Sequence, residues 1–140
     1  MARRIQAEDM VDVAGSPDAV FAVLWDVARY PDWWPAALRV RHIGGGEVEV
    51  RPRASRFRCR LGDAEPPYWL TVQYVDGPQR GEGIWTLQAL PHGATRVCYR
   101  IDLEPHGLIA RLLSYAMDFA AIHSRQMRPV LAALARRVAN

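Results

Sequence analysis

The fold is decided by residues 105–140, PHGLIARLLSYAMDFAAIHSRQMRPVLAALARRVAN. At steps of three and four residues, the apolar side chains of this stretch fall on one side of a helix, as in a helix that packs on a core. This apolar side comprises Ile109, Leu112, Ala116, Phe119, Ala120, Met127, Val130 and Leu134. The pattern predicts one long amphipathic helix over the whole stretch. Pro129 has no backbone donor, so it predicts a kink.

His123 lies in the middle of this apolar side, four residues after Phe119 and four before Met127. A titratable side chain where an apolar one is expected is the clearest indication of chemistry in the sequence. Three roles stay open: a general acid or base, a hydrogen-bond partner for a ligand carbonyl, or a core histidine satisfied by the protein. Because apolar surroundings disfavour the imidazolium, we expect the pKa of His123 to lie below its usual value of about 6.5.

The chain before residue 105 has the twofold periodicity of β-strands. A first strand is expected over residues 4–13, then a helix with Ser16 as N-cap and Pro17 at its first position. A second short helical turn follows near residues 30–35. Further strands are expected at 38–43, 47–51, 55–61, 68–74, 84–90 and 95–103, with a loop at 62–66 and a glycine-rich lead-in at 80–83. Short connections between consecutive strands predict an antiparallel meander.

These elements predict an α+β fold. A curved antiparallel sheet of about six to seven strands has a concave face, and the long C-terminal helix is the element able to cover it. The 140 residues, half of them hydrophobic, suit one domain over residues 1–140. The sequence has no apolar run long enough to span a membrane and no signal region, so we expect a cytoplasmic protein without stable membrane insertion.

The net charge of +3 comes from arginine alone, because the sequence has no lysine. The arginines are spread along the chain, which argues against a nucleic-acid partner. Their one local cluster is Arg51, Arg53, Arg56, Arg58 and Arg60. We interpret it as the solvent face of a strand, with a binding patch as the alternative. The cysteines and histidines lack ligand spacing, so no metal or cofactor is expected.

Aromatic side chains on the inward phase of the strands predict a cavity between helix and sheet, because one helix rarely fills a wide sheet. The expected ligand contacts are Trp34, Tyr74, Trp85, Tyr99, Phe119, His123 and Met127. Cyclisation of a polyketide would need a base beside a carbonyl and a donor for the enolate oxygen. His123 fits the first role, and Tyr99 or Tyr74 fits the second. The same aromatics also fit a plain core.

Three motifs carry a resemblance that extends over essentially the whole domain: GSPDAVF (15–21) continuing to DVARYPDWWP (26–35), GEGIWTL (81–87), and GATRV (93–97). Together they resemble the START-like, helix-grip superfamily, in particular its polyketide cyclase/dehydrase and lipid-transport branch. The resemblance implies a helix-grip fold and a START-like ligand-binding domain. It leaves the activity open, since the superfamily hosts carriers, cyclases, hydroxylase domains and stress proteins on one scaffold.

The sequence therefore leaves more than one class of function open. The chain is expected to bind a hydrophobic small molecule that is polyketide-, lipid- or quinone-like. As an enzyme it would be a metal-independent aromatase/cyclase or dehydratase, with His123 and Tyr99 as catalytic residues. The alternatives are a non-catalytic lipid or quinone carrier and a ligand-free accessory protein whose cavity is filled by side chains. A monomer and a homodimer are both compatible with the sequence.

Overall fold

A computed structural model describes residues 4–140, which form one seven-stranded sheet and four α-helices. The strands are β1 (Ile5–Val13), β2 (Arg41–Gly44), β3 (Glu47–Val50), β4 (Phe57–Glu65), β5 (Trp69–Asp76), β6 (Gln79–Ala89) and β7 (Thr95–Pro105). The helices are α1 (Pro17–Trp25), α2 (Tyr30–Trp33), α3 (Leu108–Leu113) and α4 (Phe119–Ala139), with single 3-10 turns at Val27–Arg29, Ala36–Leu38 and Pro91–Gly93. Neighbouring strands are antiparallel in the order β1-β7-β6-β5-β4-β3-β2. The predicted α+β fold is confirmed.

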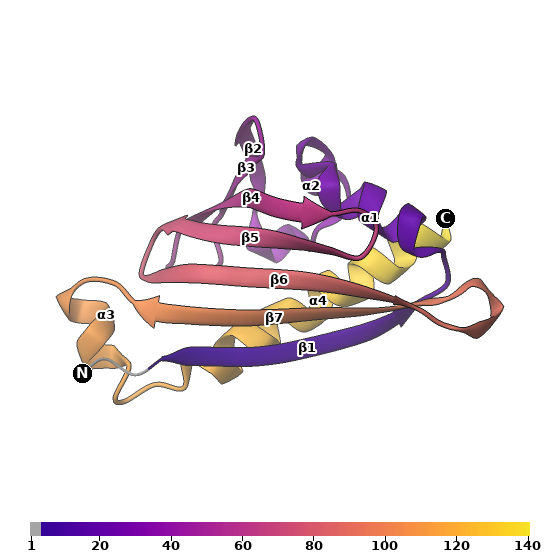
Figure 1. The fold of residues 1–140 in the computed structure, drawn as a ribbon. Coiled ribbons are helices and arrows are strands. Elements are labelled where there is room, and N and C mark those ends of the chain that lie inside the picture. Colours follow the sequence, from indigo (N-terminus) through magenta and orange to yellow (C-terminus); the bar gives the residue numbers. More distant parts are fainter. Residues whose placement is uncertain (1–3) are drawn as a thin grey trace.

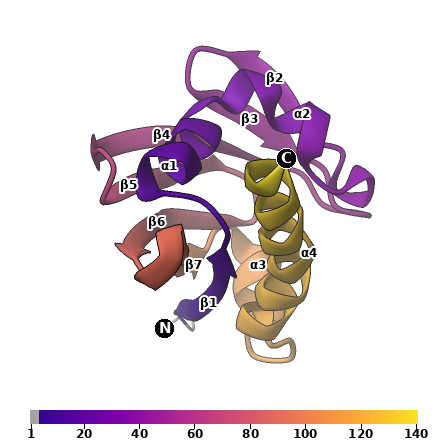
Figure 2. The ribbon, with the colours of Figure 1, turned by 90° about the vertical axis from the view of Figure 1, so that its right-hand side faces the viewer.

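The sheet curves around α4, which lies along its concave side (Figures 1 and 2). On the packed face of α4, Met127, Val130 and Leu134 are at most 6% exposed. Ser124 Oγ on the same helix donates a hydrogen bond of 2.9 Å to the Asp9 carboxylate on β1. Burial of this apolar face therefore holds the helix on the sheet, and the polar contact fixes its position beside the edge strand.

The C-terminal stretch is not the single helix that its periodicity predicts. The chain leaves the helical path after Leu113, and α4 begins anew at Phe119, where Asp118 Oδ1 accepts a hydrogen bond of 3.0 Å from the Ala121 amide. An aspartate in this position satisfies a free amide of the first turn and so favours a helix start. Ile109 and Leu112, predicted on the packed face, are 75% and 63% exposed.

Among the other local predictions from the sequence, some are confirmed and some are wrong. Ser16 caps α1 by accepting from the Ala19 amide at 3.1 Å, with Pro17 at the first position, as predicted. Helix α4 continues through Pro129 to its end. The loop expected at 62–66 and the lead-in expected at 80–83 are wrong, because β4 runs through the first as far as Glu65 and β6 already begins at Gln79. A bulge in β4 between Leu61 and Ala64 absorbs the irregularity that resembled a loop.

Candidate ligand cavity

A cavity of about 60 Å³ lies between α4 and the concave side of the sheet. Its wall is mostly apolar and includes Val27, Tyr30, Leu38, Val48, Val50, Phe57, Cys59, Leu61, Val72 and Val130. Six of the seven predicted contact residues also line it, namely Trp34, Tyr74, Trp85, Tyr99, His123 and Met127. The structure therefore brings together predicted contact residues from the C-cap of α2, three strands and α4.

Phe119, the seventh predicted contact, lines a second cavity instead. This outer cavity has about 200 Å³ and is bounded by the β3–β4 loop, the β5–β6 turn and the start of α4. Its wall comprises Pro52, Ser55, Pro78, Gln79, Met117, Phe119 and Ile122, and it shares Phe57, Tyr74, His123 and Gln126 with the inner cavity. The four shared side chains therefore separate two adjoining spaces.

His123 begins a chain of hydrogen bonds within the core. Its Nε2 lies 3.0 Å from the Tyr74 hydroxyl, which lies 2.8 Å from the Tyr99 hydroxyl. The imidazole also stacks on the Tyr99 ring, with centroids 6.0 Å apart and planes inclined by 22°. Tyr99 in turn packs against Trp85 at 4.4 Å. One residue from α4 and one each from β5 and β7 thus form a linear polar group inside an apolar wall.

All three members of this chain are neutral near pH 7. Burial lowers the pKa of His123 to about 4, and the nearby Asp9 carboxylate opposes that shift only in part. Burial also raises the pKa values of Tyr74 and Tyr99 well above 10. The prediction that His123 is buried with a lowered pKa agrees with this arrangement. A neutral imidazole donates through one nitrogen and accepts through the other.

The direction of the hydrogen bonds decides what His123 offers. If Tyr74 donates to Nε2, the proton of the ring sits on Nδ1, which becomes a donor. If Nε2 donates to Tyr74, Nδ1 carries a free lone pair and becomes an acceptor or base. Nδ1 is buried and has no hydrogen-bond partner within residues 4–140. An unpaired buried nitrogen costs about 1–3 kcal/mol, so a ligand atom that pairs with it gains that energy.

Trp34, at the C-cap of α2, forms part of the cavity wall, and Trp33 packs against it. Tyr30 stacks on Trp34 with ring centroids 5.1 Å apart, and Trp33 meets both rings edge-on. The Tyr30 hydroxyl donates to the Leu24 carbonyl, which anchors this aromatic group to α1. The buried Trp34 Nε1 also lacks a partner in the described part of the chain. The inner cavity therefore has a second unpaired polar atom in its wall, and this one is a donor.

Gly83 on β6 was missed from the sequence and is needed for the polar chain. A Cβ added there would overlap the Tyr99 ring, with its Cζ only 2.6 Å away. Strand β6 separates β5 from β7, so Tyr74 and Tyr99 meet above it only because Gly83 has no side chain. A glycine inside a strand was the available signal, since such positions often mark a close approach of another group.

No three His, Cys, Asp or Glu side chains of residues 4–140 gather into a set that could bind a metal ion. Within the same residues, no helix combines the length and the apolar character that crossing a bilayer requires.

Comparison with protein families gives a match to polyketide cyclase / dehydrase and lipid transport over residues 4–139. Comparison with curated proteins gives no match. Among solved structures, the Zhui aromatase/cyclase from Streptomyces sp. R1128 is similar with a TM-score of 0.75 and 20% identity, over 97% of this chain and 94% of that one. Norcoclaurine synthase from Thalictrum flavum, solved with dopamine and hydroxybenzaldehyde, has a TM-score of 0.69 and 12% identity, over 98% and 87%. The TM-scores show that the chain shares the helix-grip fold with these proteins.

Proposed function

Because the chain belongs to the polyketide cyclase / dehydrase and lipid transport family, we propose that it binds a polyketide-, lipid- or quinone-like molecule between α4 and the sheet. The observation that carries the proposal is the neutral His123–Tyr74–Tyr99 chain inside an apolar wall, with Nδ1 of His123 unpaired. Such a site suits a mostly apolar molecule that has one or two polar atoms, for example a ketone or quinone oxygen.

Ligand size sets a condition on this proposal. Sites for small molecules usually have about 300–1,000 Å³, so the inner cavity alone is too small. Joining it to the outer cavity brings the space near the lower end of that range. Phe57, which stacks on Tyr74 at 5.7 Å and is only partly buried, lines both spaces. We therefore expect the Phe57 side chain to move when a ligand enters.

As an enzyme, the protein would catalyse cyclisation or dehydration of a polyketide-like chain. Nδ1 of His123 would remove a proton from a carbon beside a carbonyl, the resulting carbanion would attack a second carbonyl carbon, and the proton would pass to the new alkoxide. A tyrosine hydroxyl would hold the enolate oxygen. With a pKa of about 4, His123 is a weak base in the empty cavity. A negative charge developing on the ligand would raise that pKa toward a useful value.

The alternative function is a non-catalytic carrier for a lipid or quinone. The low pKa of His123 favours this alternative, because a neutral hydrogen-bond partner needs no change of charge. In a carrier, His123 and Trp34 would hold the polar atom of the ligand, and the apolar wall would hold the rest.

Binding is tested by titrating the protein with fatty acids, quinones and polycyclic phenols while following tryptophan fluorescence. Trp34 and Trp85 line the inner cavity, so a bound molecule changes their emission. We expect a saturable response to at least one class, and no saturable response to any class contradicts the proposal. Met127→Leu is the matched control for the substitution of His123 described next, because it changes the apolar wall without changing a hydrogen bond.

His123→Phe separates the enzyme from the carrier, because it keeps the ring volume approximately and removes both nitrogens. A carrier loses about 1 kcal/mol of affinity, the usual value of one neutral hydrogen bond. An enzyme loses about a hundredfold or more in rate while still binding its ligand. Unchanged affinity for every ligand of the wild-type protein together with an unchanged reaction rate, in a variant with an intact fold, excludes His123 from the site.

A further inference from the structure

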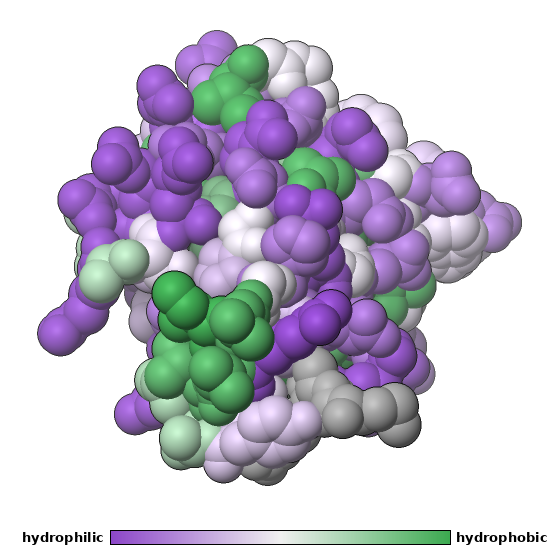
Figure 3. Space-filling model, turned by 90° about the vertical axis from the view of Figure 1, so that its left-hand side faces the viewer, coloured by the Kyte–Doolittle hydropathy of each residue, from purple (hydrophilic) through white to green (hydrophobic). Residues whose placement is uncertain are grey.

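Helix α3 and the turn after it expose a group of large apolar side chains, here called the α3 patch. It comprises Leu108, Ile109, Leu112, Leu113, Tyr115 and Met117, which are 40–75% exposed. Figure 3 views the end of the molecule where α3 lies, and hydrophobic residues (green) gather there into one area. Apolar residues scattered singly on a surface are ordinary, whereas a contiguous patch marks a contact with another apolar surface.

The inward side of α3 is formed by small residues. Ala110 is 7% exposed and Ser114 is 1% exposed, and Ser114 Oγ donates to the Arg111 carbonyl at 2.6 Å. The small side chains let the helix sit close to the body of the protein, so the large ones have to point away from it. The α3 patch is thus the outer side of an amphipathic helix whose inner side is already packed.

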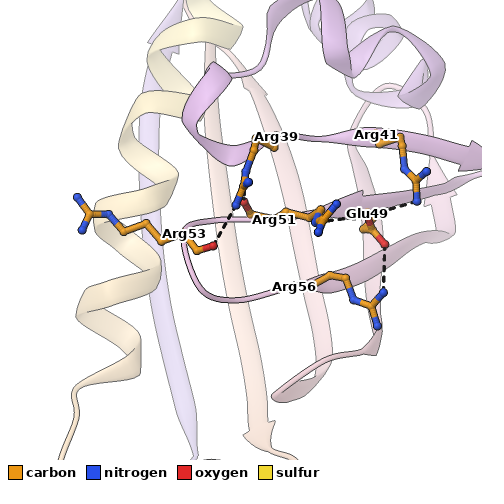
Figure 4. Close-up of polar contacts among 6 residues, drawn as sticks. All are labelled: Arg39, Arg41, Glu49, Arg51, Arg53 and Arg56. Atoms are coloured by element: carbon orange, nitrogen blue, oxygen red, sulfur yellow. Dashed lines mark hydrogen bonds and ion pairs between the residues drawn. The ribbon is translucent and has the colours of Figure 1, made fainter.

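A second surface on the same end of the molecule is strongly basic. Arg41, Arg51 and Arg56 surround the buried Glu49 carboxylate at 3.4, 4.0 and 3.7 Å (Figure 4). Arg39 donates to the carbonyls of Arg51 and Arg53, both at 3.0 Å. These five arginines, three of which surround the Glu49 carboxylate, are here called the Glu49 cluster. One buried acid cannot neutralise five guanidinium groups, so the cluster keeps a large positive excess.

The outer cavity lies between these two surfaces. Pro52 and Ser55, on the loop that carries Arg53 and Arg56, line one side of it, and Met117 of the α3 patch lines another. Strands β5 and β7 end and β4 and β6 begin at this end of the sheet, next to α3 (Figure 1). An apolar patch, a cavity and a basic cluster therefore share one end of the molecule.

We propose that this end docks on an anionic lipid surface, with the α3 patch in the interfacial layer and the Glu49 cluster at the phosphates. Leucine, isoleucine, tyrosine and methionine on the outer side of a helix suit the boundary between headgroups and acyl chains. The planar guanidinium group matches phosphate oxygens in pairs, and basic residues near a surface are attracted to anionic lipids. The contact is peripheral, since no described helix can cross a bilayer.

This inference stands apart from the proposed ligand, because docking needs only the outer surfaces. Docking would turn the outer cavity toward the lipid, so that an apolar molecule could move between membrane and protein with little exposure to water. A binding measurement on vesicles tests the surface, and the fluorescence titration tests the cavity, so each can fail alone.

The test is co-sedimentation of the full chain with vesicles of phosphatidylcholine and with vesicles of phosphatidylcholine and phosphatidylglycerol in equal parts. We expect binding to the anionic vesicles that weakens as salt is added. The double variant Ile109→Ser, Leu112→Ser should bind at least about tenfold more weakly. Tyr68→Ser is the matched control, because Tyr68 is 61% exposed in the β4–β5 turn at the opposite end of the sheet.

The basic part has its own pair of variants. Arg53→Gln with Arg56→Gln should weaken binding to anionic vesicles about tenfold or more, whereas Arg136→Gln with Arg137→Gln removes the same charge at the far end of α4 and should change it little. Absence of co-sedimentation, or equal loss from both pairs, overturns the proposal. It is also overturned if sedimentation velocity shows a dimer that Ile109→Ser, Leu112→Ser converts to a monomer, since the α3 patch is then a contact between copies.

Discussion

Helix α4 buries Met127, Val130 and Leu134 against the sheet, whereas α3, a few residues earlier in the chain, leaves Leu108 and Ile109 in water. Both helices have large apolar residues at helical spacing. They differ in what lies opposite: α4 runs along the concave side of the sheet, and α3 lies at its end (Figure 1). Helical periodicity therefore identifies the residues that share a face, while the surrounding fold decides whether that face has a partner.

The largest expected effect comes from the same substitution made in each helix. Leu134→Ala should lower the free energy of unfolding by about 2–5 kcal/mol, because the side chain is fully buried and leaves a cavity. Leu112→Ala should change it by no more than about 0.5 kcal/mol, because that side chain is 63% exposed. Urea unfolding measures both. Similar losses of stability in the two variants would show that the apolar face of α3 is packed in solution, as that of α4 is, and would contradict the difference between the two helices.

Lowering the pH should destabilise the folded protein through protonation of His123 on α4. The folded pKa of about 4 lies below the unfolded value of about 6.5, so the unfolded chain binds a proton first as the pH falls. The stability is full above about pH 6.5 and decreases by about 3 kcal/mol as the pH falls to about 4. Urea unfolding across this range measures the loss. His123→Phe serves as control, and its curve should lack this part of the pH dependence; two parallel curves would contradict the burial of His123.

Substitution of Gly83 tests the packing of Tyr74 and Tyr99 on the concave side of the sheet, along which α4 lies. Gly83→Ala should destabilise the protein by about 1–3 kcal/mol, because the added methyl group pushes Tyr99 away from Tyr74. The near-ultraviolet circular dichroism of the aromatic side chains should change with it. In Gly46→Ala the nearest atom, Leu61 Cβ, is 3.5 Å away, so this control should keep both properties. An unaltered spectrum for Gly83→Ala would mean that Tyr99 does not depend on this gap.

The smallest effect concerns the separate start of α4. Asp118→Ala should cost about 1 kcal/mol by removing the bond from the Ala121 amide, whereas Asp118→Asn should cost less because its side-chain oxygen still caps the helix. Helix α3, by contrast, has Gly107 at its N-cap and therefore no side-chain cap. Thermal unfolding compares the two variants. Equal stability of wild type and Asp118→Ala would indicate that α4 does not need its own N-terminus.

Much of the fold followed from local patterns in the sequence. Twofold alternation predicted the antiparallel strands, and Ser16 with Pro17 predicted the start of α1, because both signals act over a few residues. His123 was found by the same means, as a polar residue on an apolar helical face. The break between α3 and α4 was not found, since both sides of it continue the same apolar rhythm.

The polar chain in the cavity was only partly predictable. Strand alternation placed Tyr74 and Tyr99 on one face, but they lie on strands that are not neighbours. Their contact depends on the order of the strands and on the missing side chain of Gly83. The outer cavity, which Phe119 lines, depends likewise on loops from distant parts of the sequence, so the sequence alone could not show that two adjoining spaces exist.

The pairing of β1 with β7 has a consequence for how the chain reaches its fold. Ile5 is opposite Leu103, so β1 finds its partner only after the 98 residues that follow Ile5, as far as Leu103, have been added to the chain. At ordinary rates of translation this delay is roughly 5–20 s. Contacts between such distant residues also slow folding, because a long loop must close before they form. During synthesis, β1 is therefore an unpaired strand that chaperones can recognise.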